Sequence, residues 1–250
     1  MNKKIIRPWI ICVLLLAVAV LVIVPVYATS DVRYAKKMVS TIQNADYETV
    51  SQLAEKHPQA IHERPTVIPL WMRRVFDAPP AYYPLQTACQ VGNYEIVELL
   101  LDAGADVNVT DDLLHDTPLI LCLKTNGSEK EDKYRIATVL LDRGADPLLH
   151  RTNNGTYDAL GACIMGMVWD SPEKLQEGIQ VFERMLGMVD PDTYDPQLIL
   201  QESISLGNVE TTKCILAHFD ISPEKCVVYG RSAYEYAVEK GYTEIAELLQ

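Results

Sequence analysis

The stretch IVELLLDAGADVN, from Ile96 to Asn108, decides the fold of this chain. Its apolar residues recur at spacings of three and four, which places them on one face of a helix. Gly104 ends that pattern, as glycine does where a helix closes on a left-handed residue. The sequence LLDRGADPLL, from Leu140 to Leu149, nearly repeats the motif. Such a recurrence indicates a repeated structural unit rather than a single functional site.

A second set of glycines indicates that each repeated unit contains two helices. The segments GNYEIVELL, GNVETTKCI and GYTEIAELL begin at Gly92, Gly207 and Gly241. Each of these glycines is predicted to end a first helix, because the apolar pattern of a second helix follows at once. Thr117 precedes Pro118, and this pair suits a helix start, since the hydroxyl can cap the helix and proline tolerates its first position.

These motifs resemble the ankyrin repeat. The match is close over Gly92–Asn108 and good over Thr117–Leu123, Arg135–Pro147 and Gly230–Leu249. The resemblance implies an all-α fold, an ankyrin-repeat solenoid of about six helix-turn-helix units over residues 32–250. One helix pair is too small to bury its own apolar face, so each unit is expected to stack on its neighbours.

The first unit is degenerate, with Ala45 in the place of the glycine, and its polar face suits an N-terminal cap. An insertion is predicted at residues 62–82, between the first and second units. Two further insertions are predicted at 127–132 and 169–178, which either form a second binding face or are merely tolerated extra length. The six expected units are Val32–Ile61, Tyr83–Asp116, Thr117–Asn154, Gly155–Asp195, Pro196–Val228 and Gly230–Gln250.

Residues 1–29 are predicted to form an N-terminal transmembrane anchor or a signal peptide. The stretch from Pro8 to Ser30 carries no charge and is long enough to span a bilayer. The basic residues before it favour a cytoplasmic N-terminus and an exported remainder. The expected location is the bacterial inner membrane, with a single pass through residues 9–28 and the repeats in the periplasm. Cleavage after Ala28 would instead release a soluble exported protein.

The charge balance excludes one class of partner. The chain has 34 acidic and 22 basic residues, a formal net charge of −12, and it would repel a phosphate backbone. Nucleic acid is therefore not expected as a partner. A basic protein partner fits this charge, although many soluble domains are acidic for solubility alone.

The cysteines and histidines do not form a recognisable catalytic or metal motif. The cysteine spacings match no zinc module, and no histidine pair stands at i, i+4. Cys89, Cys122 and Cys163 occupy the small-residue positions of first helices and are expected in the core. A Cys214–Cys226 disulfide stays open, and Cys226 is expected in an exposed loop as the best candidate for a reactive thiol. We predict no enzyme, no cofactor and no metal.

Two regions are predicted to contact a protein partner. The long segment from His62 to Pro84 concentrates aromatic and basic side chains, which are frequent interface anchors. The alternative is that its aromatic residues fold back over the open end of the first unit. The resemblance also implies binding at the turn tips, at 108–116 and 150–158. The candidates are Trp71, Met72, Arg73, Arg74, Phe76, Tyr82, Tyr83, Asp111, Asp112, His115, Asn153 and Asn154.

The sequence therefore predicts a monomeric, non-catalytic module that binds another protein outside the cytoplasmic membrane. Two versions are open. The chain could scaffold or protect an enzyme, or it could neutralise a toxin, since it resembles the ankyrin-repeat immunity proteins that accompany exported bacterial toxins. The alternative from another class is an enzyme or redox protein that uses an exposed thiol such as Cys226.

Overall fold

The computed structural model describes residues 30–66, 73, 75, 80–111, 113–124, 132–149 and 158–250. Within these ranges no helix has the length and apolarity needed to cross a membrane. The predicted anchor or signal segment at 1–29 lies outside the described residues, as do residues 127–131 of one predicted insertion.

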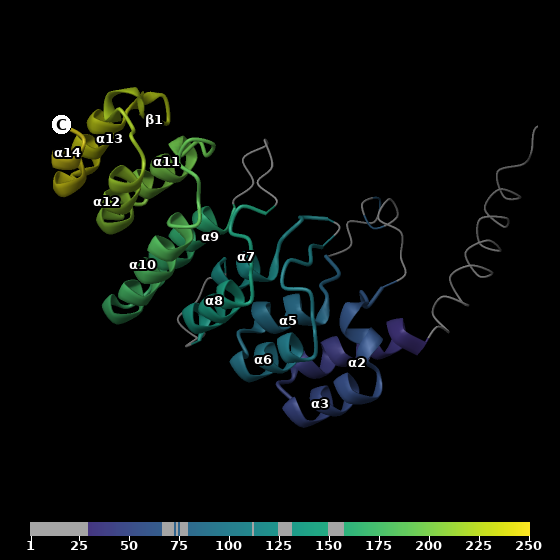
Figure 1. Cartoon of the computed structure of the whole chain (residues 1–250). Coiled ribbons are helices and arrows are strands. Elements are labelled where there is room, and N and C mark those ends of the chain that lie inside the picture. Colours follow the sequence, from purple (N-terminus) through teal and green to yellow (C-terminus); the bar gives the residue numbers. More distant parts are fainter. Residues whose placement is uncertain are drawn as a thin grey trace, which may run out of the picture. The chain divides into compact units, whose positions relative to one another are not determined.

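The described residues contain twelve α-helices, arranged as six consecutive pairs (Figure 1). We refer to them as helix pairs one to six. The pairs agree with the six predicted units. In chain order they are α2 (Ser30–Gln43) with α3 (Tyr47–Lys56), α5 (Pro84–Val91) with α6 (Tyr94–Asp102), α7 (Pro118–Leu123) with α8 (Lys133–Asp142), α9 (Ala159–Gly166) with α10 (Pro172–Leu186), α11 (Gln197–Ser205) with α12 (Val209–His218), and α13 (Ala233–Lys240) with α14 (Thr243–Leu248).

The chain divides into two compact units. The first contains the described residues up to Ala88 together with Glu95–His115, and the second contains Cys89–Tyr94 and the described residues from Asp116 onward. In the first unit, α2 packs against α3 and against the 3-10 helix η1 (Pro58–His62). Met38 and Val50 are fully buried between these helices and form part of its core.

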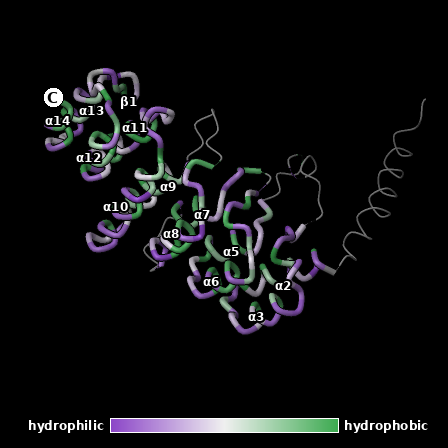
Figure 2. Tube along the Cα trace, in the orientation of Figure 1, coloured by the Kyte–Doolittle hydropathy of each residue, from purple (hydrophilic) through white to green (hydrophobic). Residues whose placement is uncertain are grey.

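The second unit is built from two rows of helices. The first helices contact one another in the order α7, α9, α11 and α13, while α8, α10, α12 and α14 form the second row. Apolar stretches alternate with polar ones along these helices in Figure 2. The largest buried side chains include Leu123, Leu160 and Phe182. Each pair thus buries its apolar face against the next pair, as expected of stacked repeats.

The predicted helix boundaries have the expected chemistry. Thr117 accepts a hydrogen bond from Ile120 N at 3.2 Å and caps α7, with Pro118 at the first helical position. Gly92, Gly207 and Gly241 all have positive φ. Ala45 has a φ of 54° at the equivalent place in pair one, so the degenerate unit keeps the turn without its glycine.

Two expectations about the fold were wrong. Residues 169–178 are not an insertion between helices, because α10 begins at Pro172 and takes up most of this segment, with Ser171 as its N-cap. The fold is also not purely α. Strands β1 (Val227–Val228) and β2 (Arg231–Ser232) form a short antiparallel hairpin before pair six. Tyr229 and Gly230 between them both have positive φ, which is the requirement of a type I′ turn.

Candidate protein-binding surface

A small pocket opens in the first unit beside the turn that follows α6. Its volume is about 200 Å³. The walls come from the end of η1, from the start of α5 and from the turn. The lining residues are Ile61, His62, Tyr83, Leu85, Ala105, Asp106 and Val109. Of the predicted binding residues, Tyr83 is the one that lines this pocket.

Backbone hydrogen bonds hold the pocket walls in place. The amide of Tyr83 donates to Gln86 Oε1 at 2.9 Å, and its carbonyl accepts from Thr87 N, also at 2.9 Å. On the opposite wall, Asp106 Oδ1 accepts from Asn108 N at 2.9 Å. This Asx turn fixes the chain directly before Val109. Contacts within the chain therefore hold both walls of the pocket.

The turn tip after this pocket is shaped by Asp111, which was predicted to contact a partner. Its side chain is buried, and Oδ1 accepts hydrogen bonds from Leu113 N and Leu114 N, both at 2.7 Å. The carboxylate therefore organises its own turn. Leu114 and His115 are exposed at the tip, and His115 has a φ of 59°. His115, also a predicted contact residue, therefore lies at the surface of the turn tip.

The other predicted binding residues have mixed outcomes. Arg73 is only 2% exposed, which differs from the surface anchor that the sequence suggested. Tyr82 is half-buried. The remaining candidates lie outside the described residues: Trp71, Met72, Arg74, Phe76, Asp112, Asn153 and Asn154.

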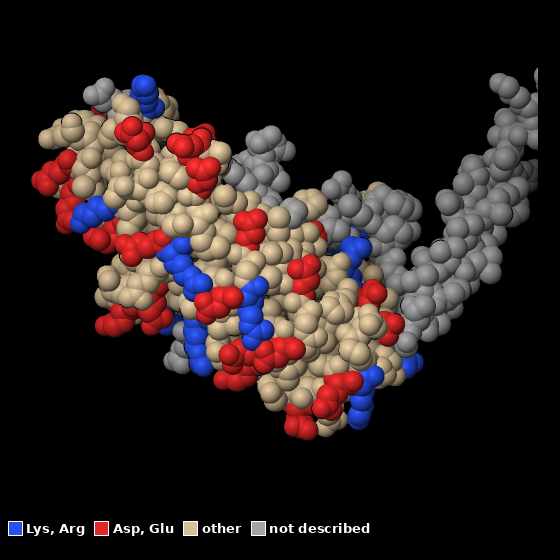
Figure 3. Space-filling view, in the orientation of Figure 1, with Lys and Arg blue, Asp and Glu red and all other residues tan. Residues whose placement is uncertain are grey.

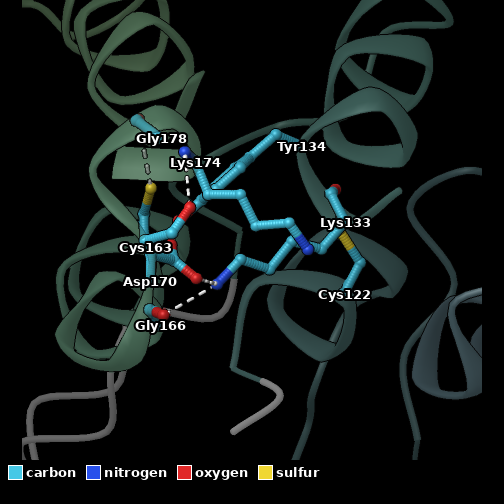
Figure 4. A network of polar contacts seen from close by, with 9 residues as sticks. Cys122, Lys133, Tyr134, Cys163, Gly166, Asp170, Lys174 and Gly178 are labelled. Carbon is cyan, nitrogen blue, oxygen red and sulfur yellow. Dashed lines mark hydrogen bonds and ion pairs between the residues drawn. The ribbon is translucent and has the colours of Figure 1, made fainter. Parts of the chain in front are cut away.

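The second unit contains a buried polar network that the sequence did not indicate (Figure 4). Lys133, at the start of α8, extends its ammonium group to Asp170 Oδ1 at 2.6 Å and to the carbonyl of Gly166 at 2.7 Å. The hydroxyl of Tyr134 donates to the other carboxylate oxygen of Asp170. The network therefore ties pair three to pair four.

Two buried thiols, those of Cys122 and Cys163, lie beside this network. Cys122 Sγ donates to the carbonyl of Lys133 at 3.2 Å, and Cys163 Sγ lies 3.7 Å from the carbonyl of Gly178. Burial, together with the neighbouring Cys163, raises the pKa of Tyr134. Burial and the neighbouring Cys122 raise the pKa of Cys163. Both groups stay protonated at neutral pH, so they serve as hydrogen-bond donors and not as nucleophiles.

The network cannot act on a substrate, because its charged groups are enclosed. The side chains of Lys133 and Asp170 are each 3% exposed. Asp170 directly precedes the Ser171-Pro172 helix start, and its partner Lys133 stands 37 positions earlier in the sequence. Neither residue has a pattern that identifies the other, so pairing them required the structure.

The prediction that Cys226 is an exposed, reactive thiol was also wrong. Cys226 directly precedes strand β1 and is fully buried, and burial raises its pKa. All five cysteines in the described ranges are free, so no Cys214–Cys226 disulfide is present there. Cys214 is the half-exposed one, and burial followed by a hydrogen bond to Glu183 raises its pKa to about 11. No cysteine in the described part of the chain is therefore both exposed and activated.

Surface charge agrees with the composition. Figure 3 shows carboxylates at many points of the face in view, with fewer Lys and Arg side chains among them. Some basic side chains of the described residues are paired, as Arg184 is with Asp142 at 2.7 Å. Within the described ranges no three His, Cys, Asp or Glu side chains come together as a metal site would require.

Comparisons with known proteins fit this architecture. A family model described as ankyrin repeats in three copies matches residues 38–151. This part of the chain is similar to the ankyrin-repeat family. The ankyrin repeat-containing protein YGL242C of Saccharomyces cerevisiae is 31% identical over 72 residues, or 28% of this chain. That match spans 40% of the length of the yeast protein.

One solved structure has a similar fold over a larger part of the chain. A chain from the complex of the Bd0816 predatory endopeptidase of Bdellovibrio bacteriovorus with immunity protein Bd3460 has a similar fold, with a TM-score of 0.55. The two chains are 14% identical, and the superposition covers 85% of this chain and 95% of the other. At this identity the likeness concerns the fold alone.

Proposed function

We propose that the chain is a non-catalytic immunity protein that captures an exported enzyme and keeps it inactive. The observation that carries the proposal is the pocket beside Tyr83, which belongs to an ankyrin-repeat surface and is formed in advance. A preformed site loses little conformational entropy when a partner binds. The solved complex that shares this fold contains an endopeptidase and its immunity protein, which supports the same kind of partner here.

The pocket can receive one anchoring side chain of the partner. Its walls combine the apolar groups of Ile61, Leu85 and Val109 with the rings of His62 and Tyr83. A volume of about 200 Å³ suits a single large side chain and is smaller than a typical small-molecule site, which has roughly 300–1,000 Å³. We propose that the exposed Leu114 and His115 at the turn tip contact the partner around this anchor.

The proposed place of action is outside the cytoplasmic membrane. Residues 1–29 would tether the repeats to the inner membrane, or export them if the chain is cut after Ala28. The net charge of −12 favours a basic enzyme as the partner through electrostatic attraction. If the chain is instead a scaffold that protects an enzyme, the binding site is the same but the bound enzyme stays active. The version with a Cys226 nucleophile is not proposed, because that thiol is buried.

Deletion of the gene in the producing bacterium tests the proposal. The deletion strain should be killed or outcompeted by its own parent, and the wild-type chain should restore its resistance. Normal growth and competition would overturn the immunity function, and a co-purifying enzyme that stays active while it is bound would establish the scaffold version in its place.

Variants of the pocket connect that phenotype to the site. Val109→Arg fills the pocket and Tyr83→Ala removes one wall, so neither should restore resistance. Tyr47→Ala is the matched control, because Tyr47 is an exposed tyrosine on α3 of the same unit and lies outside the pocket. Full protection by Val109→Arg at wild-type protein levels would show that the partner binds elsewhere.

A further inference from the structure

A second hollow lies in the second unit, between the turn after α10 and the turn after α12. One part has a volume of about 440 Å³ and is lined by Pro191, Asp192, Pro196, His218, Phe219, Asp220 and Ile221. The other has about 460 Å³ and is lined by Pro196, Gln197, Asp220, Ile221, Ser222 and Lys225. The two parts share Pro196, Asp220 and Ile221, so they are adjacent. We call the two parts together the turn groove.

A chain of side-chain contacts supports the apolar wall of the turn groove. Phe219 is buried, and its ring stacks on Tyr194 with 5.6 Å between centroids. Tyr194 in turn donates its hydroxyl to Asp158 Oδ2 at 2.8 Å. Two prolines, Pro191 and Pro196, restrict the backbone of the facing turn. The groove therefore keeps its shape without an occupant.

Carboxylates in and around the turn groove have two different roles. Asp190 and Asp195 brace the turn, since their Oδ1 atoms accept from Asp192 N at 3.0 Å and Gln197 N at 3.1 Å. The exposed carboxylates of Asp192 and Asp220, by contrast, have no hydrogen bond or ion pair with any described residue. These two line the groove, so it presents negative charge that the fold does not use.

A buried nitrogen also lacks a partner at this place. Nε2 of His218 is enclosed and has no hydrogen bond to any residue that the structure describes. The imidazole ring packs edge-on against Phe219, with 4.8 Å between centroids, and lines the groove. A buried polar atom without a partner is costly, and a polar group of an occupant would remove that cost.

We infer that the turn groove binds an extended segment of a partner protein that carries an arginine or lysine beside an apolar side chain. The cation pairs with Asp192 and Asp220, and the apolar neighbour packs on Pro196 and Ile221. Lys225 lines the other end, so the cation is directed to the end that contains His218. Opposite charges at close range and an adjacent apolar wall together give both specificity and affinity.

This inference rests on the proposed function only in that the chain binds a protein. The pocket beside Tyr83 belongs to the first unit and the turn groove to the second. Variants of one site leave the other intact, and a failure of either proposal can be told from a failure of the other.

Peptide capture on the immobilised full chain tests the inference. The probes are pools of seven-residue peptides with randomised flanks and a fixed central residue, which is arginine, lysine, citrulline or glutamate. The chain should retain the arginine and lysine pools at least about tenfold more than the citrulline pool, and the retained peptides should be enriched in apolar neighbours. Equal retention of the arginine and citrulline pools overturns the inference, as does preference for the glutamate pool.

Variants of the full chain show whether capture occurs in the turn groove. Asp192→Asn with Asp220→Asn should reduce retention to that of the citrulline pool, and Ser222→Arg should do the same by placing a cation in the groove. The matched control is Glu55→Gln with Glu247→Gln, which removes two exposed charges from α3 and α14. A control that loses retention equally would show that net charge alone retains the peptides, and would overturn the assignment.

His218→Phe separates binding from folding. Phenylalanine keeps the ring contact with Phe219 and removes the unpartnered nitrogen, so the Tm should not fall while retention of the arginine pool decreases. Unchanged retention would exclude His218 from the binding site.

Discussion

Lys133 and Asp170 form an ion pair inside the second unit, with 2.6 Å between Nζ and Oδ1 and 3% of each side chain exposed. The ammonium also donates to Gly166 O, and the carboxylate accepts from Tyr134. Removing two charges from water is costly, and such a pair is stable only when further hydrogen bonds satisfy its atoms. The additional contacts to Gly166 and Tyr134 meet that condition.

Asp170→Asn should lower the free energy of unfolding by about 3–5 kcal/mol, because it leaves the Lys133 charge buried without a counter-ion. Lys133→Met combined with Asp170→Asn should recover much of this loss, since no uncompensated charge remains. Urea unfolding followed by circular dichroism gives both values. The control is Arg184→Met, which breaks an exposed pair with Asp142 and should change stability by less than about 1 kcal/mol. A similar loss in the single and double variants would contradict the prediction.

Gly178→Ala should destabilise the protein by about 1–3 kcal/mol through overpacking. A Cβ at Gly178 would lie 2.6 Å from the hydroxyl oxygen of Tyr134, so this ring would have to move away from Asp170. Gly187→Ala is the matched control in the same helix pair, because its Cβ would meet no atom closer than 3.5 Å. Thermal unfolding should give a clear fall in Tm for the first variant alone. Equal Tm values would show that Tyr134 is free to shift.

Ala45→Gly should stabilise the first unit by about 0.5–1 kcal/mol. The φ of 54° at Ala45 is unfavourable for a residue with a Cβ, and glycine removes this strain at a smaller entropic cost. Gly144→Ala tests the reverse change, since Gly144 has a φ of 87° and open space around its Cβ position. It should lose about 1 kcal/mol from backbone strain alone. Shifts of the same sign in the two urea midpoints would refute this account.

Mild alkylation with iodoacetamide should modify Cys214 before the other four cysteines in the described ranges. Cys214 is the half-exposed one of the five, and Cys226 is buried. The pKa of Cys214 is raised to about 11, so the thiol is almost fully protonated at neutral pH and reacts slowly. Its rate should rise about tenfold for each unit of pH between 7 and 10, because the thiolate is the nucleophile. Mass spectrometry identifies the site, and earlier labelling of Cys226 would contradict its burial.

The repeated helix pairs were predictable because their signals are local. Glycine after an apolar helix and Thr117 before Pro118 mark boundaries by backbone chemistry alone. The twelve helices of the described residues lie within the predicted units, except that α2 begins two residues before the first unit, at Ser30. The burial of Cys89, Cys122 and Cys163 followed from their positions in first helices. The start of α10 within the segment 169–178 is difficult to predict. The first helix of this pair continues into a short 3-10 helix, Met167–Trp169, and Ser171 is the only sequence signal for the start of α10.

The sites were less predictable because they depend on contacts between distant residues. Asp111 looks like a solvated turn acid, and only the fold shows that its carboxylate accepts two amides of its own loop. The turn groove joins residues near 192 with residues near 220, and no motif connects the two. Tyr83 was found because aromatic residues in a long irregular segment are conspicuous, but its pocket also requires Val109 from another turn.

The ion pair of Lys133 with Asp170 also limits how a chain of this kind can change its length. Repeat proteins grow and shrink by duplication or loss of whole units, since each unit contacts only its neighbours. Loss of pair three or pair four alone would leave one buried charge without its counter-ion. These two units can therefore be inherited, copied or deleted together much more readily than apart, and their shared boundary is a poor place for recombination.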